Sequence, residues 1–188
     1  GTGASLAGDI SSGTYSVGGT GDITLTGNVQ GTLTKVGANK LILGGTIDNN
    51  GLGLVANSGT VVLGKTNSAS GHAIGGVGLT VAGATVQLGG TGGDQIYFTA
   101  DVTINSGTFD LNGQDEGFDA LSGSGGSILN NAASTTSTLT VGSDNNGGLY
   151  SGTIANGAGT VALTKIGSGI QTLGGNNSYS GLTTVSAG

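Results

Sequence analysis

Four carboxylates crowd into the stretch FDLNGQDEGFDAL, residues 109–121. They are Asp110, Asp115, Glu116 and Asp119. Two acids on opposite sides of a sugar linkage can hydrolyse a glycosidic bond, one as the proton donor and the other as base or nucleophile. The stretch also has the pattern of a strand, an acidic turn and a second strand, in which Asp110 would face outward between Phe109 and Leu111. We favour this second interpretation and assign no catalytic residue.

A calcium-binding pattern is the next candidate for chemistry. Residues 89–97 read GGTGGDQIY and fit the nonapeptide GGxGxDxUx, which would use Gly90, Gly92 and Asp94. Arrays of this kind share each ion between consecutive copies, and the other approach to the pattern, GGTGD at residues 18–22, is one residue short and distant. We therefore interpret the segment as a turn before a strand at Ile96 and assign no metal site, with calcium binding as the alternative.

The single histidine and the tyrosines offer little more. His72 could act as a base, but no GxSxG motif supplies a serine nucleophile for it, so we expect an exposed polar residue in a loop. Tyrosine rings can stack on sugars, and the chain has four of them: Tyr15, Tyr97, Tyr150 and Tyr179. Corner packing is the preferred role for Tyr179.

Composition limits the partners that the chain can bind. Ten carboxylates outnumber four lysines, the net charge is −6, and there is no cluster of cations. We therefore expect no nucleic-acid binding and no membrane insertion, and no apolar run approaches the roughly 18 residues that span a bilayer. The absence of cysteine excludes disulfides and thiolate metal sites and suits export through an oxidising compartment. We expect no cofactor.

Short strands recur along the chain at a steady period. Each alternates apolar and polar residues and stops at glycine or asparagine: DITLTG (22–27), KLILGG (40–45), GTVVLG (59–64), ATVQLG (84–89) and GTFDLNG (107–113). From Leu25 to Leu111, four steps cover 86 residues, about 21.5 per step, which is a solenoid period. No window has the apolar spacing of a helix. These features predict an all-β, right-handed parallel β-helix (β-solenoid) of about eight coils of roughly 22 residues.

A second strand precedes several of these segments and defines the expected core. An alignment of LGLVANSGTVVLG, GLTVAGATVQLG and DVTINSGTFDLNG matches Val55, Val81 and Ile104. We predict that six positions point inward in stacked ladders: Val55, Val81, Ile104, Leu63, Leu88 and Leu111. Glycine and asparagine would form the corners, and the lack of proline suits strands that pair on both edges.

One phrase occurs twice. Residues 33–45 read LTKVGANKLILGG and residues 163–175 read LTKIGSGIQTLGG, an offset of 130 residues or six periods of roughly 21.7. The second copy lies in GTVALTKIGSGIQTLGGNNSYSGLTTVSAG (159–188), which resembles the autotransporter-associated β-strand repeat, roughly GtLtKtGxGtLtLsGxNtYsGxTtvxaG. Matching positions are Gly159, Leu163, Lys165, Gly167, Gly169, Leu173, Gly175, Asn177, Tyr179, Gly181, Thr183, Val185 and Gly188. Residues 109–157 look like the segments that alternate with this repeat, and residues 31–64 match loosely.

The resemblance implies a passenger-type β-helix in an extracellular bacterial protein that serves as stalk, adhesive surface or matrix, without catalytic residues. Departures from the pattern are Gln171 and the pair Asn39 and Lys40, which leave the register of those corners open. A β-helical polysaccharide lyase or polygalacturonase is the enzyme alternative, although such enzymes use arginine or lysine beside acids. An ice- or sugar-binding face would need a regular lattice, and the outward threonines are spaced irregularly: Thr24/Thr26, Thr32/Thr34 and Thr183/Thr184.

We therefore expect one β-solenoid domain over residues 1–188, a mature form or a segment of a longer repeat protein. The expected function is non-enzymatic, structural or adhesive, at the bacterial surface or beyond it, with polysaccharide binding or degradation as the alternative. Neither end carries a recognisable cap over its apolar ladder. The expected partners are therefore further coils or other copies stacked end to end as a filament, and surface glycans.

Overall fold

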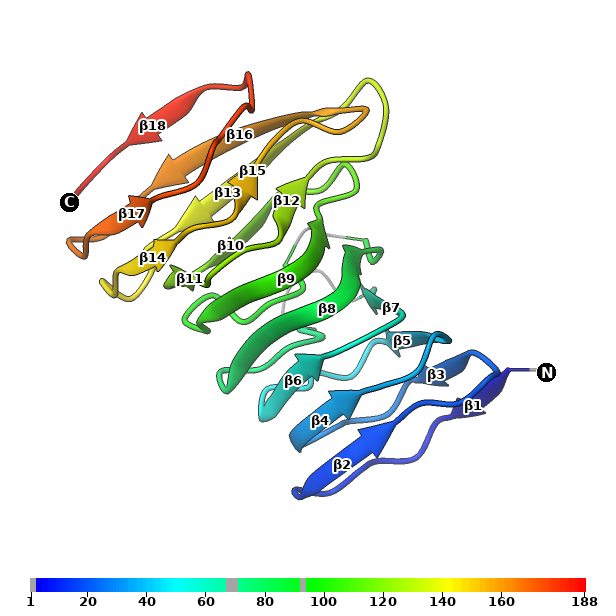
Figure 1. The fold of residues 1–188 in the computed structure, drawn as a ribbon. Coiled ribbons are helices and arrows are strands. Elements are labelled where there is room, and N and C mark those ends of the chain that lie inside the picture. The colour runs from blue at the N-terminus through cyan, green and yellow to red at the C-terminus, as the bar shows by residue number, and fades with distance from the viewer. Residues whose placement is uncertain (1–2, 67–70, 92–93) are drawn as a thin grey trace.

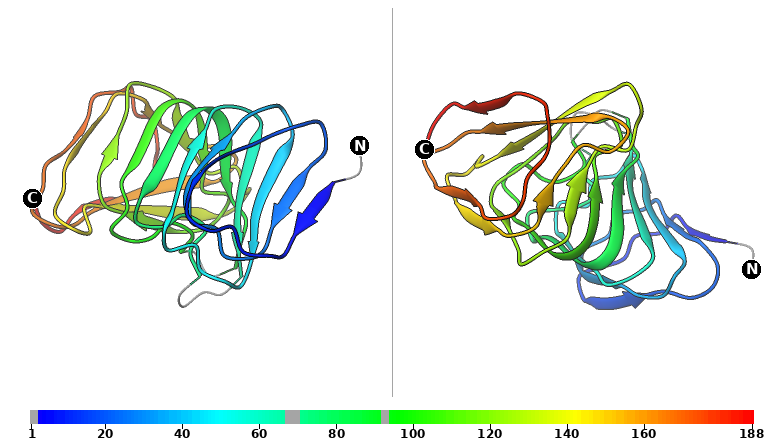
Figure 2. Two further views of the ribbon diagram at one scale, coloured as in Figure 1. Left: turned by 90° about the horizontal axis from the view of Figure 1, so that it is seen from below. Right: turned by 45° about the horizontal axis from the view of Figure 1, so that its top comes forward.

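The computed structural model describes residues 3–66, 71–91 and 94–188, and these form a parallel β-solenoid of about eight coils (Figure 1). The coils stack along one axis, with the two termini at opposite ends (Figure 2). All of the strand ladders in the described residues are parallel. The predicted fold class and period are confirmed, while the right-handed winding remains a prediction.

Each coil has three sides, which we call A, B and C. Side A contains β2 (Thr14–Val17), β4 (Gly31–Lys35), β6 (Leu52–Ala56), the first part of β8 (Gly78–Leu88), the first part of β9 (Val102–Asp110), β11 (Leu121–Ser122), β14 (Gly148–Tyr150) and β17 (Gln171–Leu173). Side B contains β1 (Ala4–Leu6), β3 (Ile23–Leu25), β5 (Lys40–Gly45), β7 (Thr60–Lys65), the ends of β8 and β9, β12 (Ser127–Leu129) and β15 (Thr153–Ile154).

Side C changes character along the chain. Its later part is a sheet of β10 (Glu116–Phe118), β13 (Thr136–Val141), β16 (Thr160–Lys165) and β18 (Thr183–Val185). In the described residues of its earlier part there are two isolated bridges, Ile10 with Val29 and Ile74 with Ile96. Coil length also varies, since Ile23 pairs with Leu41, 18 positions later, and Ile128 with Ile154, 26 positions later. The loops that join the sheets absorb this variation, so the ladders stay in register.

Strands β8 and β9 run from side A to side B without a break. A shift of register at Ala82 and glycines with positive φ, Gly83 (133°) and Gly107 (85°), bend them at the corner. Glycine is needed there because a side chain disfavours this backbone conformation. The two bent strands join sides A and B into one sheet.

Most of the predicted core is confirmed. Leu63, Val81, Leu88, Ile104 and Leu111 are fully buried, and Leu25, Leu43, Leu63 and Leu88 stack in register on side B. Val55 was wrongly predicted to point inward. In β6 the inward residues are Leu52, Leu54 and Ala56, and Ala56 rather than Val55 pairs with Val81. Matching valine to valine shifted this strand by one residue, which exchanges its two faces.

The two copies of the LTK phrase do not lie in one ladder. Lys35 ends β4 on side A, and its module continues to β5 on side B. Lys165 ends β16 on side C, and its module continues to β17 on side A. Although the two copies are offset by about six periods, they therefore do not occupy the same position in the coil. What repeats is a unit of strand, corner and strand that can start on different sides.

Candidate functional sites

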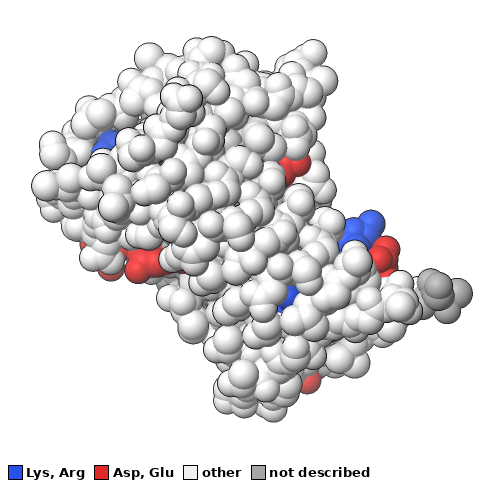
Figure 3. Space-filling view, viewed as in Figure 1, with Lys and Arg blue, Asp and Glu red and all other residues white. Residues whose placement is uncertain are grey.

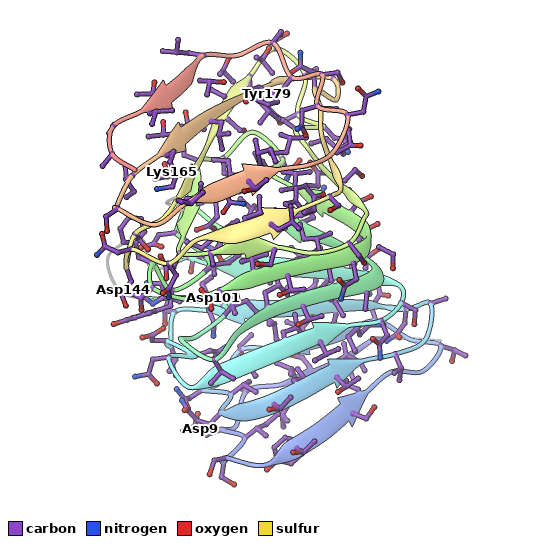
Figure 4. The ribbon with its side chains drawn as sticks, turned by 60° about the vertical axis from the view of Figure 1, so that its left-hand side comes forward. Asp9, Asp101, Asp144, Lys165 and Tyr179 are labelled. Carbon is purple, nitrogen blue, oxygen red and sulfur yellow. The ribbon has the colours of Figure 1, made fainter. Side chains whose placement is uncertain are left out.

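The acidic side chains mainly fasten one coil to another. Within the described residues, eight of the ten acids accept a hydrogen bond from a backbone N–H: Asp9, Asp22, Asp48, Asp101, Asp110, Asp115, Glu116 and Asp119. Asp101 Oδ1 accepts from Ala120 N at 3.1 Å in the following coil (Figure 4). A carboxylate that accepts such bonds satisfies a backbone donor that no strand partner reaches.

The candidate acids of residues 109–121 are each used in this way. Asp110 was expected to face outward between Phe109 and Leu111, and its side chain is only 2% exposed. Gln87 Nε2 and Asn131 Nδ2 donate to its Oδ2 at 3.0 and 3.2 Å, so neighbouring coils cover it. Asp115 Oδ1 accepts from Thr138 N at 2.7 Å, and Asp119 Oδ1 from Asp144 N at 2.8 Å. These acids bind separate neighbours in the later coils.

Glu116 is also buried, with 2% of its surface exposed. Its carboxylate accepts from the backbone N–H groups of Gln95 at 2.9 Å and Gly117 at 3.1 Å. Burial raises the pKa of Glu116 well above its usual value, while these hydrogen bonds lower it. The side chain thus joins β10 to the loop before β9 and points away from solvent.

His72 is buried rather than exposed, which corrects the expectation from the sequence. It is 9% exposed and lies between two carboxylates on the irregular part of side C. Its Nδ1 lies 3.0 Å from Asp48 Oδ1, and its Nε2 lies 3.4 Å from Asp94 Oδ2. The ring of Tyr97 packs edge-on against it, with centroids 4.9 Å apart. His72 therefore links three consecutive coils where that side has no continuous sheet.

The calcium pattern falls on this same cluster. Asp94 pairs with His72, and a Cβ added to Gly90 would lie 2.0 Å from the carbonyl oxygen of Lys65, so Gly90 is required for close packing. Gly92 lies outside the described residues. Among residues 3–66, 71–91 and 94–188, no group of three or more His, Asp or Glu side chains is placed to hold a metal ion.

Two corner lysines were not anticipated as structural sites. Lys35 is fully buried, and its Nζ donates to Val36 O at 2.7 Å, Gly37 O at 2.8 Å and Ser58 O at 3.2 Å in the next coil. Burial lowers the pKa of Lys35.

Lys165 repeats these contacts almost atom for atom. Its Nζ donates to Ile166 O, to Gly167 O at 2.8 Å and to Ala187 O at 3.5 Å in the next coil (Figure 4). Gly167 has a positive φ of 65°, as Gly37 does at 76°, which turns the carbonyls toward the amine. The shared sequence LTKxG could have indicated this role, because a lysine amine at the end of a strand can donate hydrogen bonds to the carbonyls of a tight corner.

The departures from the repeat pattern also form cross-coil contacts. Asn39 Oδ1 accepts from Lys35 Nζ at 3.1 Å, and its Nδ2 donates to Gly21 O at 2.8 Å in the previous coil. Gln171 passes over Gly148, and its Nε2 donates to Leu121 O at 2.8 Å, two coils back. Both corners keep their register because an amide replaces a residue of the pattern and bonds to backbone.

The tyrosines have different surroundings. Tyr150 is fully buried, and burial raises the pKa of its hydroxyl. Tyr179 is half-buried and its hydroxyl lies 2.8 Å from Thr183 Oγ1, in agreement with the corner role (Figure 4). Tyr15 donates to Ser11 O at 2.8 Å, and Tyr97 is 39% exposed beside His72. The four rings do not stack in one ladder.

Two hollows on the surface are lined by described residues. A cavity of about 250 Å³ opens at the C-terminal end between Leu163, Ile170, Leu173, Tyr179 and Val185. A groove of about 160 Å³ crosses the outer face of side A over β4, β6, β8 and β9. The described residues include no helix long and apolar enough to cross a membrane.

Comparison with known families gives a match for the last coil. Residues 163–188 match the passenger-associated-transport repeat, which confirms the resemblance over that part of the chain. This repeat begins within β16, passes through Lys165 and ends after β18. Its position in a parallel β-solenoid is consistent with an autotransporter passenger β-helix. Searches among curated proteins and among solved structures gave no match.

Proposed function

We propose that this chain is a non-enzymatic structural and adhesive segment of a passenger β-helix, outside the bacterial cell, in a stalk, surface fibre or matrix. The observation that carries the proposal is the passenger-associated-transport repeat of residues 163–188, stacked in register on the preceding coils. Such repeats occur in secreted autotransporter passengers. The use of eight acids as backbone acceptors supports a structural role for the charged residues.

The alternative is a protein that acts on polysaccharides. Its degrading form draws little support from the candidate acids, because each of them is bonded to a backbone donor of a neighbouring segment. Polysaccharide binding is supported by the groove on side A and is compatible with an adhesive role.

The proposal includes end-to-end association. Three apolar side chains of the last coil are strongly exposed: Ile170 (77%), Leu182 (74%) and Val185 (67%). At the other end, Leu6 of β1 is 48% exposed. Exposed apolar side chains beside unpaired strand edges favour the addition of another coil, and a head-to-tail contact between copies propagates as a filament.

Two measurements test the role and the location. Proteinase K added to intact cells of the source bacterium should remove the chain from the surface, and its persistence until the cells are lysed would contradict the location. Purified protein incubated with neutral and acidic polysaccharides should release no reducing ends. Measurable turnover would instead support the enzyme alternative.

Association is tested by sedimentation velocity over a range of protein concentrations. The unaltered chain should form oligomers, and Val185→Glu should dissociate them because it places a charge at the apolar end. Ile47→Glu is the matched control, because Ile47 is also exposed (48%) but lies in a loop of an earlier coil. A monomer at all concentrations, or equal effects of the two variants, would contradict end-to-end association.

A further inference from the structure

The strand register places hydroxyl groups in rows on the outer face of side A. One row runs through Thr34, Val55, Thr80 and Thr103, and the next through Thr32, Gly53 and Gly78. The residues between these rows, such as Leu54 and Leu79, point inward. The sequence indicated Thr32 and Thr34, but Thr80 and Thr103 join them only through the register.

A groove lies within these rows. Gly53 and Gly78 lie side by side in its lining and are both buried, and Val77 packs over Gly53, since a Cβ added there would be 2.6 Å from Val77 Cγ1. The groove of about 160 Å³ takes its lining from four adjacent strands, β4, β6, β8 and β9. Strands in a sheet are about 4.8 Å apart, so the groove runs about 14 Å along the solenoid axis.

The lining combines apolar and polar groups in a small area. Val55 and Val77 supply apolar surface, and Val77 is 65% exposed. Thr32, Thr80 and Thr103 supply hydroxyl groups that both donate and accept hydrogen bonds. Sugar rings present both C–H faces and hydroxyl groups, so they match a lining of this mixed kind.

The charge of the groove selects among sugars. Asp101 is the one charged residue of the lining, and the face seen in Figure 3 is largely uncharged. Asp101 Oδ1 is bonded to Ala120 N, while its Oδ2 has no hydrogen bond within the described residues and is available to a sugar hydroxyl. With no lysine in the lining and a net charge of −6, an anionic glycan would be repelled.

We infer that this groove binds an extended, uncharged polysaccharide that runs along the solenoid axis across successive coils. This inference rests on the proposed adhesive function and gives it a ligand class and a site. The groove is far from the C-terminal cavity, so glycan binding and end-to-end association use separate surfaces.

Titration calorimetry with defined hexasaccharides tests the inference. The probes are cellohexaose, laminarihexaose and mannohexaose as neutral chains, and hexagalacturonate as the anionic one. At least one neutral probe should bind, and hexagalacturonate should bind at least tenfold more weakly. Thr80→Trp should fill the groove and reduce the affinity for the neutral probe at least tenfold. Thr164→Trp is the matched control on side C, where Thr164 is also a half-buried, outward residue of a strand.

A second variant addresses charge without filling the groove. Asp101→Asn keeps an oxygen for Ala120 N and should weaken the preference against hexagalacturonate by about threefold, in line with a single partly exposed charge. Binding of no neutral probe, preference for the anionic probe, or equal affinity of Thr80→Trp and the unaltered chain would overturn the inference. These outcomes leave the surface location and the lack of turnover untouched, so failure of the groove is distinguishable from failure of the proposed function.

Discussion

Two corners of the solenoid, at Lys35 and Lys165, are built from the same contacts in different settings. Each lysine donates to two carbonyls of its own corner and to a third in the next coil. The first corner joins side A to side B between β4 and β5, with further coils stacked on both sides of it, and the second joins side C to side A in the coil before β18. The same corner can therefore occur between different sides of the solenoid. The segments that flank it determine which sides it joins.

The two corners differ in how deeply their residues are buried. Leu43, near the end of the first module, is fully buried, while Leu173 at the equivalent place is half-buried. Lys35 is fully buried and Lys165 is 8% exposed. Identical contacts therefore lie in surroundings of different solvation, so the same substitution should cost different amounts at the two corners.

The largest difference is expected for the leucines. Leu43→Ala removes side-chain volume from the closed ladder and should lower the free energy of unfolding by about 3 kcal/mol. Leu173→Ala should lower it by about 1 kcal/mol because its surroundings are partly solvated. Urea titrations followed by circular dichroism measure both. Equal losses would show that Leu173 is as well packed as Leu43.

The next largest loss of stability is expected for substitutions of the lysines. Lys35→Met leaves the carbonyls of Val36, Gly37 and Ser58 without this donor and should cost about 2 kcal/mol, and Lys165→Met about 1 kcal/mol. Lys40→Met is the control, since Lys40 is exposed and its ion pair with Asp22 spans 3.9 Å, so its loss should cost less than about 0.5 kcal/mol. The same urea titrations apply. A larger effect at Lys40 than at Lys35 would refute the corner role.

An exchange of corner residues sharpens the comparison further. Asn39 and Gly169 occupy equivalent places, but a Cβ at Gly169 would lie 2.3 Å from Asn145 O. Gly169→Asn should therefore cost about 2 kcal/mol through this clash, whereas Asn39→Gly should cost about 1 kcal/mol through lost hydrogen bonds. Hydrogen exchange of the flanking amides reports each corner separately. Improved protection in Gly169→Asn would contradict the close packing.

The smallest effect concerns a third lysine. Lys65 is fully buried, and among the described residues its Nζ donates one long hydrogen bond, 3.5 Å to Gly27 O. Desolvation lowers the pKa of Lys65 to about 8, although Asp48 opposes the shift. Above this pH the unfolded chain binds more protons than the folded one, so stability should rise with pH, by up to about 1 kcal/mol between pH 8 and 9.5.

Lys65→Met supplies the control for this pH dependence. The variant should show a flatter stability profile between pH 8 and 9.5 in the same urea titrations. The range stops there because the raised pKa of Tyr150 acts in the opposite direction at higher pH: the folded chain then holds the proton that the unfolded chain loses. If the substitution left the pH dependence of stability unchanged, titratable groups other than Lys65 would be its cause.

The sequence predicted the features that depend on local alternation. The leucines from Leu25 to Leu111 recur at the end of each strand, so period and fold class follow from them. Val55 was misplaced because LGLVA contains apolar residues at adjacent positions, and only pairing with Val81 and Thr80 decides which face each takes. Coil lengths of 18 and 26 residues coexist, so no single offset could show that Lys35 and Lys165 lie on different sides.

The candidate sites were harder to predict because they are assembled across coils. His72, Asp48 and Asp94 are separated by more than twenty residues from one another, and only Asp94 belongs to a recognised pattern, the calcium nonapeptide. The groove depends on Gly53 and Gly78 lying in register, which the loop lengths determine. The corner lysines were visible in the repeated phrase, but their carbonyl partners include residues of the following coil.

The parallel ladders give the chain a mechanical response. Because parallel strand ladders join each coil to the next along the stack seen in Figure 2, tension applied through the two termini loads their hydrogen bonds one row at a time rather than all at once. Each coil of about 22 residues that peels away would release roughly 70 Å of extended chain. A tether built in this way should yield in steps and limit the force on whatever it holds. Single-molecule stretching would record these steps as a regular sawtooth, and rupture in one event would exclude such behaviour.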